Sequence, residues 1–436
     1  MKRMKLGYFF TGFGHHVASC RHADSLKRGG MNLEKIIEQA KILEQMKFDF
    51  LFFSDALYLD KKTHPDVSSR FEPFTLMSMI STYTKDLGLI VTGSTTFSEP
   101  FSLARILSSL DHLSEGRAGW NIVTSGINDT AKNFNGTSNI AHDLRYEQAE
   151  EFIQITTQLW DSWKDIHFEE QQKKGYFLNE SGPQPINYEG KFYSVQGPLN
   201  IETSPQGYPL LVQAGSSKKG SEFASKFAEV VFTAQNNIDD AITFAKHLKE
   251  SAKYQRGSQQ EVIVMPGIFP VIGDTREEAE HNYEALQELI VPEVGLELLS
   301  SYLGDLDLSN YDLKTPFENI ELQEGNNIQS RVKLISDTAK SEQYTLEDVM
   351  KHVAGARGHH IVIGTATDIA DKMEEWFRKG AADGFNIMPP LNPTQFELFI
   401  EQVIPILQER NLIQLEYKSG TLREKLGLTF NYSAVK

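Results

Sequence analysis

The chain has 436 residues and a net charge of −16, from 43 lysines and arginines against 59 aspartates and glutamates. This balance excludes sequence-independent nucleic-acid binding, which needs clustered basic residues, and disfavours adsorption to anionic membranes. No apolar run approaches the roughly 20 residues of a membrane-spanning helix, and the basic N-terminus lacks a signal peptide's long apolar centre. Cys20, the single cysteine, has no partner for an internal disulfide, so we predict a cytoplasmic protein.

Apolar, β-rich runs alternate with helical patterns along the first half of the chain, as in successive β–α units. Asn32 is a candidate N-cap, Pro73 and Pro100 suit first helical turns, and Gly116 suits a helix end. Strands are predicted at residues 5–10, 48–54, 87–95 and 116–125, and the helix after the fourth strand at 146–163.

The alternation continues in the second half. Strands are predicted at residues 210–214, 229–234, 262–272 and 384–388, and helices at 218–228, 239–254, 368–379 and about 396–407. Eight strands with intervening helices predict an α/β protein, a closed (β/α)8 TIM barrel with insertions. A doubly wound open sheet is the alternative, because alternation alone does not show closure. We find no linker and predict one domain over residues 1–436.

Two segments depart from the alternation. Residues 165–206 are rich in turn formers and predict a small hairpin lying over the barrel. Residues 274–347 form the second insertion, and between residues 274 and 324 there are fourteen acidic and two basic residues. We expect helical excursions and a long loop there, outside the regular alternation and without an isolated second core.

A candidate anion site follows the fifth predicted strand in the run AGSSKKG. Gly215 lets a ligand approach the backbone, and Ser216 and Ser217 offer hydroxyl and N–H groups at a helix start. The alternative is an ordinary serine N-cap. His142 and Tyr146 are four residues apart, so on a helix they share one face and can reach one ligand.

Two basic clusters are candidates for the barrel mouth. His15, His16, Arg21 and His22 follow the first strand, and Arg357, His359 and His360 form the second cluster. Zinc is an alternative for the first cluster, but adjacent histidines diverge and no carboxylate completes a ligand set, so we predict no metal. Solvated loops are the alternative for the second. Both clusters suggest a substrate with a carboxylate or sulfonate, held by His16, Arg21, Arg357 and His359.

Six motifs occur in one order along the chain and carry a family resemblance. They are GHHVASCRH (14–22), FDFLFFSDAL (48–57), VTGSTTFSEPF (91–101), GRAGWNIVTS with AHDLRYEQAEEF (116–152), PLLVQAGSSKKG (209–220) and ARGHHIVIGT (356–365). Together they resemble the nitrilotriacetate monooxygenase component A and dibenzothiophene-sulfone monooxygenase group of the bacterial luciferase-like superfamily. The resemblance covers almost the whole chain and is specific for family, not for substrate.

The resemblance implies a flavin-dependent monooxygenase. Reduced FMN would come from a separate NAD(P)H:flavin reductase and, with O₂, oxygenate a small organic substrate next to nitrogen or sulfur. Absence of a Gly-rich dinucleotide fingerprint agrees with nicotinamide being the reductase's substrate. The implied FMN contacts are Asp55, Thr92, Ser94, His142, Tyr146, Ser216 and Ser217. We also expect a homo-oligomer.

Two other functions remain open from the sequence. A deazaflavin-dependent oxidoreductase could use the same barrel and would differ in the reduced cofactor that it binds. A non-catalytic flavin-binding protein would differ by showing no turnover with oxygen and a substrate.

Overall fold

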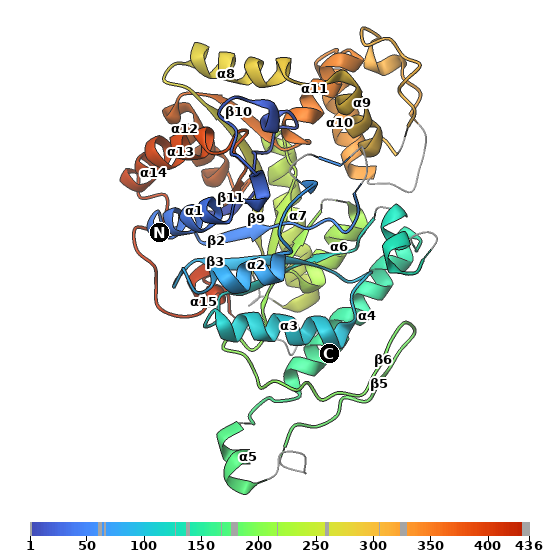
Figure 1. The fold of residues 1–436 in the computed structure, drawn as a ribbon, viewed down its shortest axis with the longest axis vertical. Coiled ribbons are helices and arrows are strands. Elements are labelled where there is room, and N and C mark those ends of the chain that lie inside the picture. The colour runs from blue at the N-terminus through green and yellow to red at the C-terminus, as the bar shows by residue number, and fades with distance from the viewer. Residues whose placement is uncertain are drawn as a thin grey trace.

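The computed structural model describes residues 2–59, 63–64, 67–126, 128–136, 140–166, 168–175, 182–215, 217–257, 261–304, 306–322 and 329–429. Within them, eight parallel strands close into a ring, since β1 pairs with both β2 and β11 (Figure 1). The ring strands are β1 (Lys5–Phe9), β2 (Phe50–Phe53), β3 (Gly88–Ser94), β4 (Ala118–Val123), β7 (Leu210–Ala214), β8 (Val230–Thr233), β9 (Ile263–Ile272) and β11 (Gly384–Ile387). The predicted barrel is confirmed, and the open sheet is wrong.

Helices follow the strands and carry the predicted caps. Asn32 accepts the N–H of Lys35 and caps α1 as predicted, and Pro73 and Pro100 stand in the first turns of α2 and α3 as predicted. Glu72 and Asn237, which were not predicted, cap α2 and α7. Helix α4 begins at His142, four residues before the predicted start at 146, because its first turn, HDLR, carries no apolar periodicity. The surrounding helices are α1 (Leu33–Gln45), α2 (Pro73–Ile80), α3 (Pro100–Leu113), α4 (His142–Asp161), α6 (Lys218–Phe227), α7 (Ile238–Arg256), α12 (Ala366–Arg378), α13 (Thr394–Leu398) and α14 (Ile404–Glu409).

A further strand, β10 (His360–Gly364), lies outside the ring and was not predicted. It pairs with Ile268–Ile272 in the second half of β9, beyond the residues through which β9 pairs with β8. Ile361 and Ile363 pack in a small cluster with Phe269 and Val271 of β9. This strand was not predicted because it has only five residues and begins at the second of two histidines, so its apolar run is short.

The acidic segment builds four helices at one end of the molecule (Figure 1). They are α8 (Arg276–Glu288), α9 (Pro292–Tyr302), α10 (Gln329–Ser341) and α11 (Leu346–Ala356). Their apolar faces form a hydrophobic cluster of their own, but Val17 and Ala18 from the loop after β1 belong to it. The cluster is therefore joined to the barrel rather than isolated. The number of domains stays a prediction.

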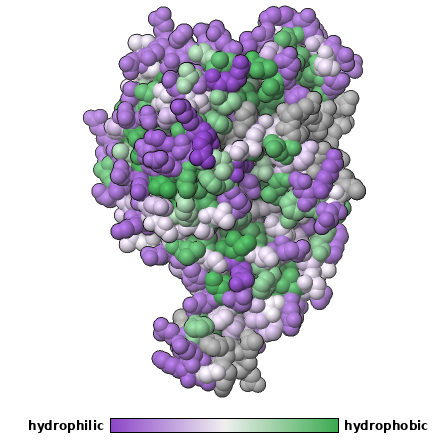
Figure 2. Space-filling model, viewed as in Figure 1, coloured by the Kyte–Doolittle hydropathy of each residue, from purple (hydrophilic) through white to green (hydrophobic). Residues whose placement is uncertain are grey.

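The other insertion contains α5 (Phe168–Lys174) and the predicted hairpin, β5 (Tyr188–Glu189) with β6 (Ser194–Val195). Figure 1 shows both projecting at the end of the molecule opposite the acidic segment. In the face shown in Figure 2, hydrophilic residues predominate along the outline and hydrophobic ones form separate patches. In the described parts of the chain, no helix combines the length and the apolar character needed to cross a membrane.

The barrel interior is an apolar core that is closed at one end by the short helix α15 (Leu422–Leu426). Leu422, Leu426 and Leu428 pack against Phe50 and Phe52 of β2 and against inward residues of five other strands. A Cβ on Gly88 would lie 2.6 Å from Leu422, so the start of β3 must be a glycine for the helix to seat. This helix plugs the end at which the strands begin.

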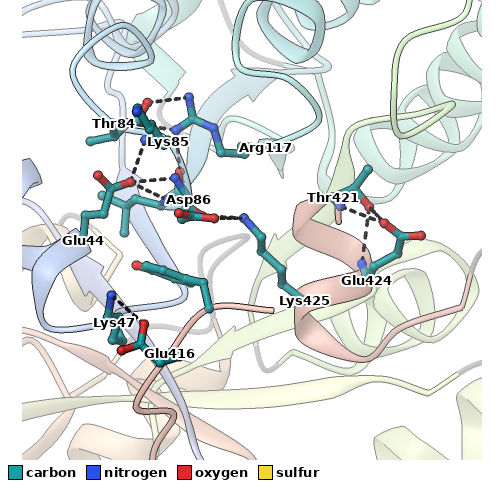
Figure 3. Close-up of polar contacts among 12 residues, drawn as sticks. Glu44, Lys47, Thr84, Lys85, Asp86, Arg117, Glu416, Thr421, Glu424 and Lys425 are labelled. Carbon is teal, nitrogen blue, oxygen red and sulfur yellow. Dashed lines mark hydrogen bonds and ion pairs between the residues drawn. The ribbon is translucent and has the colours of Figure 1, made fainter. Parts of the chain in front are cut away.

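Polar contacts hold this end together (Figure 3). The Glu44 carboxylate accepts the backbone N–H groups of Lys85 and Asp86 at 2.7 and 2.6 Å, just before β3. Lys425 of α15 donates to the Asp86 carboxylate at 2.7 Å. Beside them, Arg117 donates five hydrogen bonds from its side chain, all to groups that lie before β3 and β4.

The most buried ion pair at this end joins Arg423 to Glu229. The Arg423 side chain is 3% exposed, lies 2.6 Å from a Glu229 oxygen, and also donates to the carbonyls of Gln206, Tyr208 and Pro209. Glu229 in turn accepts the N–H of Leu211 in β7. The pair thus ties α15 to the starts of β7 and β8.

Replacing Arg423 by methionine should destabilise the protein by about 3–5 kcal/mol, because the buried Glu229 carboxylate is left without its counter-charge. Denaturant unfolding followed by circular dichroism measures the change. The control is Arg410→Met, which breaks partly exposed pairs with Asp371 and Glu374; both carboxylates remain in contact with water, so the loss should stay at about 1 kcal/mol. Equal losses in the two variants would contradict the role given to the Arg423–Glu229 pair.

Candidate functional site

The predicted anion site lies where α4 and α6 begin, at the end of the barrel where the strands finish. The Ser217 hydroxyl accepts the N–H of Gly220 at 3.0 Å and caps α6. A Cβ on Gly220 would lie 2.9 Å from the Ser217 hydroxyl and 3.2 Å from the Tyr146 hydroxyl. The structure therefore brings these two hydroxyls together around a residue that has room only as glycine. Ser216 and the His142 side chain lie outside the described residues.

Tyr146 is held in this position by its ring. The ring packs edge-on against Phe223 of α6, with centroids 5.6 Å apart. Gln213, at the end of β7, contributes a further amide to the same place, 3.6 Å from the Cβ position of Gly220. Its Oε1 is buried and has no hydrogen-bond partner among the described residues. Sequence reasoning missed Gln213, although a glutamine in an apolar strand is a visible signal.

Thr92 and Asn121 form an oriented pair on the inner wall of the barrel. The Asn121 amide donates to the Thr92 hydroxyl at 2.9 Å, and that hydroxyl donates to the carbonyl of Phe53 at 3.0 Å. Within the part of the chain that the structure describes, the remaining oxygen of Asn121 is buried without a partner, and so is Oδ1 of Asn386 on β11. Buried acceptors of this kind are rare unless a ligand completes them, so this wall fits a flavin ring that carries N–H groups.

Ser94 and Asp55 occupy the loops beside this wall. The Ser94 hydroxyl lies 2.8 Å from that of Ser125 and accepts the N–H groups of Thr96 and Phe97, so it shapes the loop after β3. Asp55 follows β2 and lies 3.8 Å from the Arg70 guanidinium. Burial raises the pKa of Asp55, and the charge of Arg70 opposes that rise.

His15 and Arg357 come together at the mouth from opposite ends of the chain. His15 is fully buried, its Nε2 lies 2.9 Å from the carbonyl of Phe9, and its Nδ1 contacts the Arg357 guanidinium. Arg357 also lies over the Phe9 ring, 5.9 Å from its centre. Burial lowers the pKa of His15 well below its usual value, and Arg357 lowers it further.

His64 and His359 complete this group, which we call the mouth cluster: His15, His64, Arg357 and His359. Burial, followed by the charge of Arg357, lowers the pKa of His64 as well. A Cβ on Gly267 of β9 would lie 2.4 Å from His359 Nδ1, so the imidazole lies directly on the inner wall. Sequence reasoning did not single out His64, which stands alone in a loop with no pattern around it. His15 and His64 are therefore neutral beside the permanent charge of Arg357, and the charge of Arg70 also lowers the pKa of His64.

His16 and Arg21, predicted to bind substrate, face the acidic segment instead. His16 lies beside Tyr283 of α8, with ring centroids 6.3 Å apart, and its Nδ1 accepts the N–H of Ala18. Burial lowers the pKa of His16 to about 4. Arg21 is exposed and donates to the carbonyl of Leu289 at the end of α8. Arg21 thus contacts α8, whereas His16 stays close enough to the mouth cluster for its charge to lower the pKa of His64. Their role in substrate binding stays a prediction.

His360 is separated from His359 by the start of β10. Its ring stacks on Trp376 of α12, with centroids 4.4 Å apart, outside the barrel ring. Among the described residues, no group of three or more His, Cys, Asp or Glu side chains has the arrangement of a metal site. That the protein uses no metal is untested and stays a prediction.

Comparison with known proteins identifies the family. The model of the luciferase-like monooxygenase family matches residues 9–383. N-acetyl-S-(2-succino)cysteine monooxygenase of Bacillus subtilis (strain 168) is 49% identical over 427 residues, covering 98% of this chain and 97% of that protein. Nitrilotriacetate monooxygenase component A of Aminobacter aminovorans is 38% identical over 440 residues, covering 98% and 97%.

A solved structure agrees with both relatives. The crystal structure of DmoA from Hyphomicrobium sulfonivorans superposes with a TM-score of 0.86 at 30% identity, covering 98% of this chain and 92% of that one. The predicted resemblance, fold class and reaction type are thereby confirmed, and the orphaned acceptors on the inner wall fit the family's cofactor. The chain belongs to the luciferase-like monooxygenase family and is a flavin-dependent monooxygenase that works with reduced FMN and O₂.

Proposed function

We propose that this enzyme oxygenates a small substrate that contains nitrogen or sulfur and carries carboxylate groups, using reduced FMN delivered by a separate flavin reductase. The observation that carries the proposal is the position of Arg357 at the barrel mouth. It contacts His15 and stacks on Phe9 among histidines whose pKa values burial has lowered. The positive charge that a substrate meets at the mouth is therefore that of the Arg357 guanidinium.

A guanidinium suits a carboxylate because its N–H groups match the two oxygens. Arg357 adopts a left-handed conformation, with φ of +54°, where α11 ends. That conformation turns the chain sharply between α11 and β10, so that Arg357 and His359 both reach the mouth. The single N–H of neutral His15 already donates to the Phe9 carbonyl, because its Nδ1 accepts from Arg357, so the guanidinium is the group that offers N–H donors to a carboxylate. The substrates named for the two relatives above, N-acetyl-S-(2-succino)cysteine and nitrilotriacetate, both carry several carboxylates.

The FMN phosphate is assigned to the hydroxyls of Ser217 and Tyr146, the first turn of α6, Ser216, and His142 at the first turn of α4. A helix start offers free N–H groups to an anion, and the neighbouring hydroxyls add donors. Asp55, Thr92 and Ser94 then border the flavin ring. Bound reduced FMN supplies the activation of O₂, while the surrounding residues orient the substrate and keep water out.

The proposal also covers the oligomeric state and the location in the cell. The enzyme is a homo-oligomer, which light scattering after size exclusion would test. It works in the cytoplasm, in agreement with Cys20 as the single cysteine of the chain.

Purified protein given NADH, FMN and O₂ alone should show little NADH oxidation. Adding an unrelated flavin reductase should start turnover of N-acetyl-S-(2-succino)cysteine, read as release of a free thiol. Nitrilotriacetate tests tolerance of a second carboxylated substrate, and dimethyl sulfide is the uncharged comparison. Rapid NADH oxidation without the reductase would contradict the two-component arrangement. Equal turnover of dimethyl sulfide would contradict the carboxylate preference.

Ser217→Ala should weaken FMN binding about ten- to hundredfold, the effect of losing a hydrogen bond to a charged group worth roughly 1.5–3 kcal/mol. His142→Ala should cost a similar factor, and the two losses should not add, because both side chains serve one phosphate. Riboflavin, which lacks the phosphate, is the control ligand and should bind all variants alike. An equal loss of riboflavin affinity would show that these residues do not hold the phosphate.

Arg357→Gln should raise the KM for the carboxylated substrate at least about tenfold, because the cation is removed while a polar side chain of moderate length stays. The matched control is Arg276→Gln, an exposed arginine of α8 that pairs with Asp368. An unchanged KM in Arg357→Gln would refute the assignment.

The wild-type KM should also fall as the pH is lowered from 8 to 6. The free enzyme keeps His15 and His64 neutral because their pKa values are lowered. A bound carboxylate raises those pKa values, so substrate binding takes up protons and strengthens as the pH falls. Calorimetric titration in buffers of different ionisation enthalpy measures this uptake directly. A proton release on binding would contradict the proposed arrangement.

A further inference from the structure

The β5–β6 hairpin is anchored by a buried carboxylate on α4. Glu151 is 8% exposed, and its two oxygens accept the backbone N–H groups of Lys191, Phe192 and Tyr193 at 2.9–3.2 Å. These residues form the turn between the two strands. A hairpin with two residues in each strand has little stability of its own, so its place depends on this anchor.

The same turn reaches from α4 to the barrel mouth through Tyr193. The Tyr193 hydroxyl donates to the carbonyl of Thr95 at 3.1 Å and accepts from the Gln148 amide at 2.7 Å. Its ring packs edge-on against Phe152, with centroids 5.7 Å apart. Burial raises the pKa of Tyr193 to about 12, so the hydroxyl remains a donor at neutral pH. Thr95 directly follows β3, beside Ser94.

The two halves of α4 are held differently. The second half packs into the main core through Phe152, Ile155, Leu159 and Trp160. The first half carries the phosphate candidates His142 and Tyr146. Tyr146 and Ala149 also reach the main core, and Glu150 pairs with Lys226 of α6 at 2.7 Å. Its described polar link to the loop after β3 runs through Gln148 and Tyr193. The hairpin is thus a strap between this half of the helix and the loop after β3.

We propose that Glu151 and Tyr193 are positioning residues for the FMN phosphate, because the strap they hold sets the first half of α4 at the barrel mouth. This rests on the proposed assignment of the phosphate to α4 and α6. Neither side chain touches the phosphate. Their effect passes through the position that α4 gives to Tyr146 beside Ser217.

Glu151→Gln replaces one accepting oxygen by an amide, and we expect the Kd for FMN to rise about tenfold. Tyr193→Phe removes only the hydroxyl and should raise it about threefold to tenfold. Titration followed by flavin fluorescence measures the Kd of both variants for FMN, and their affinity for riboflavin should not change. Glu151→Asp keeps the carboxylate and should restore part of the loss. The matched control is Glu147→Gln, one turn earlier, whose partner Lys191 is 63% exposed; it should bind FMN like the wild type.

Turnover separates positioning from a purely structural role. When the concentration of reduced FMN is high enough to saturate the variants, their kcat should match that of the wild type. Their KM for reduced FMN should rise by the same factor as their Kd. Loss of affinity for both flavins, or no loss for FMN, would overturn the proposal. If Glu151→Gln does not fold, the same measurements on Tyr193→Phe test the proposal.

Ser217→Ala, titrated in parallel, separates the two hypotheses. If it loses FMN selectively while the strap variants do not, the strap inference alone is wrong. If Ser217→Ala also fails to distinguish FMN from riboflavin, the phosphate assignment itself is wrong.

Discussion

Closure of the ring between β1 and β11 is the constraint on which the rest of the structure depends. Lys5 pairs with Gly384, where a Cβ would lie 2.2 Å from the Lys5 carbonyl, so the last strand has to begin with glycine. Asp383, the residue before it, accepts the N–H of Val264 and pairs with Lys2 and Lys249. These contacts join the first, seventh and eighth ring strands at one point. Once the ring is closed, every loop after a strand is brought to the same mouth.

Burial decides the chemistry available at that mouth. Removing His15 and His64 from water disfavours their charged forms, and the Arg357 guanidinium acts in the same direction. A cluster that looks strongly basic in the sequence therefore carries its charge on Arg357, while His15 and His64 are neutral. An apolar wall lies directly below it, formed by Phe9, Phe52 and Phe232. Such a site can bind an anionic group at its rim and keep water from the reacting atoms.

The sequence was informative where one physical signal dominated. Eight buried strands appear as eight apolar runs because parallel strands are covered on both faces. The turn at Ser217 was visible because small residues at a helix start have few other uses. By contrast, His15 and His16 are adjacent and chemically identical, yet His15 contacts Arg357 while His16 lies beside Tyr283 of the acidic segment, a difference that depends on tertiary packing. Strand β10 and the Asn121–Thr92 pair depend on register between distant segments, which local patterns do not contain.

The helix α15 closes the end of the barrel at which the strands begin, and it is synthesised after all of the ring strands. All eight ring strands precede α15, so the ribosome has produced the whole ring before Leu422 and Arg423 emerge. Until then Phe50 and Phe52 face an open end, and Glu229 lacks its arginine. The nascent barrel thus passes through a stage with an uncovered apolar funnel. Mutations in α15 should therefore reduce the yield of soluble protein more than they reduce the activity of the molecules that complete folding.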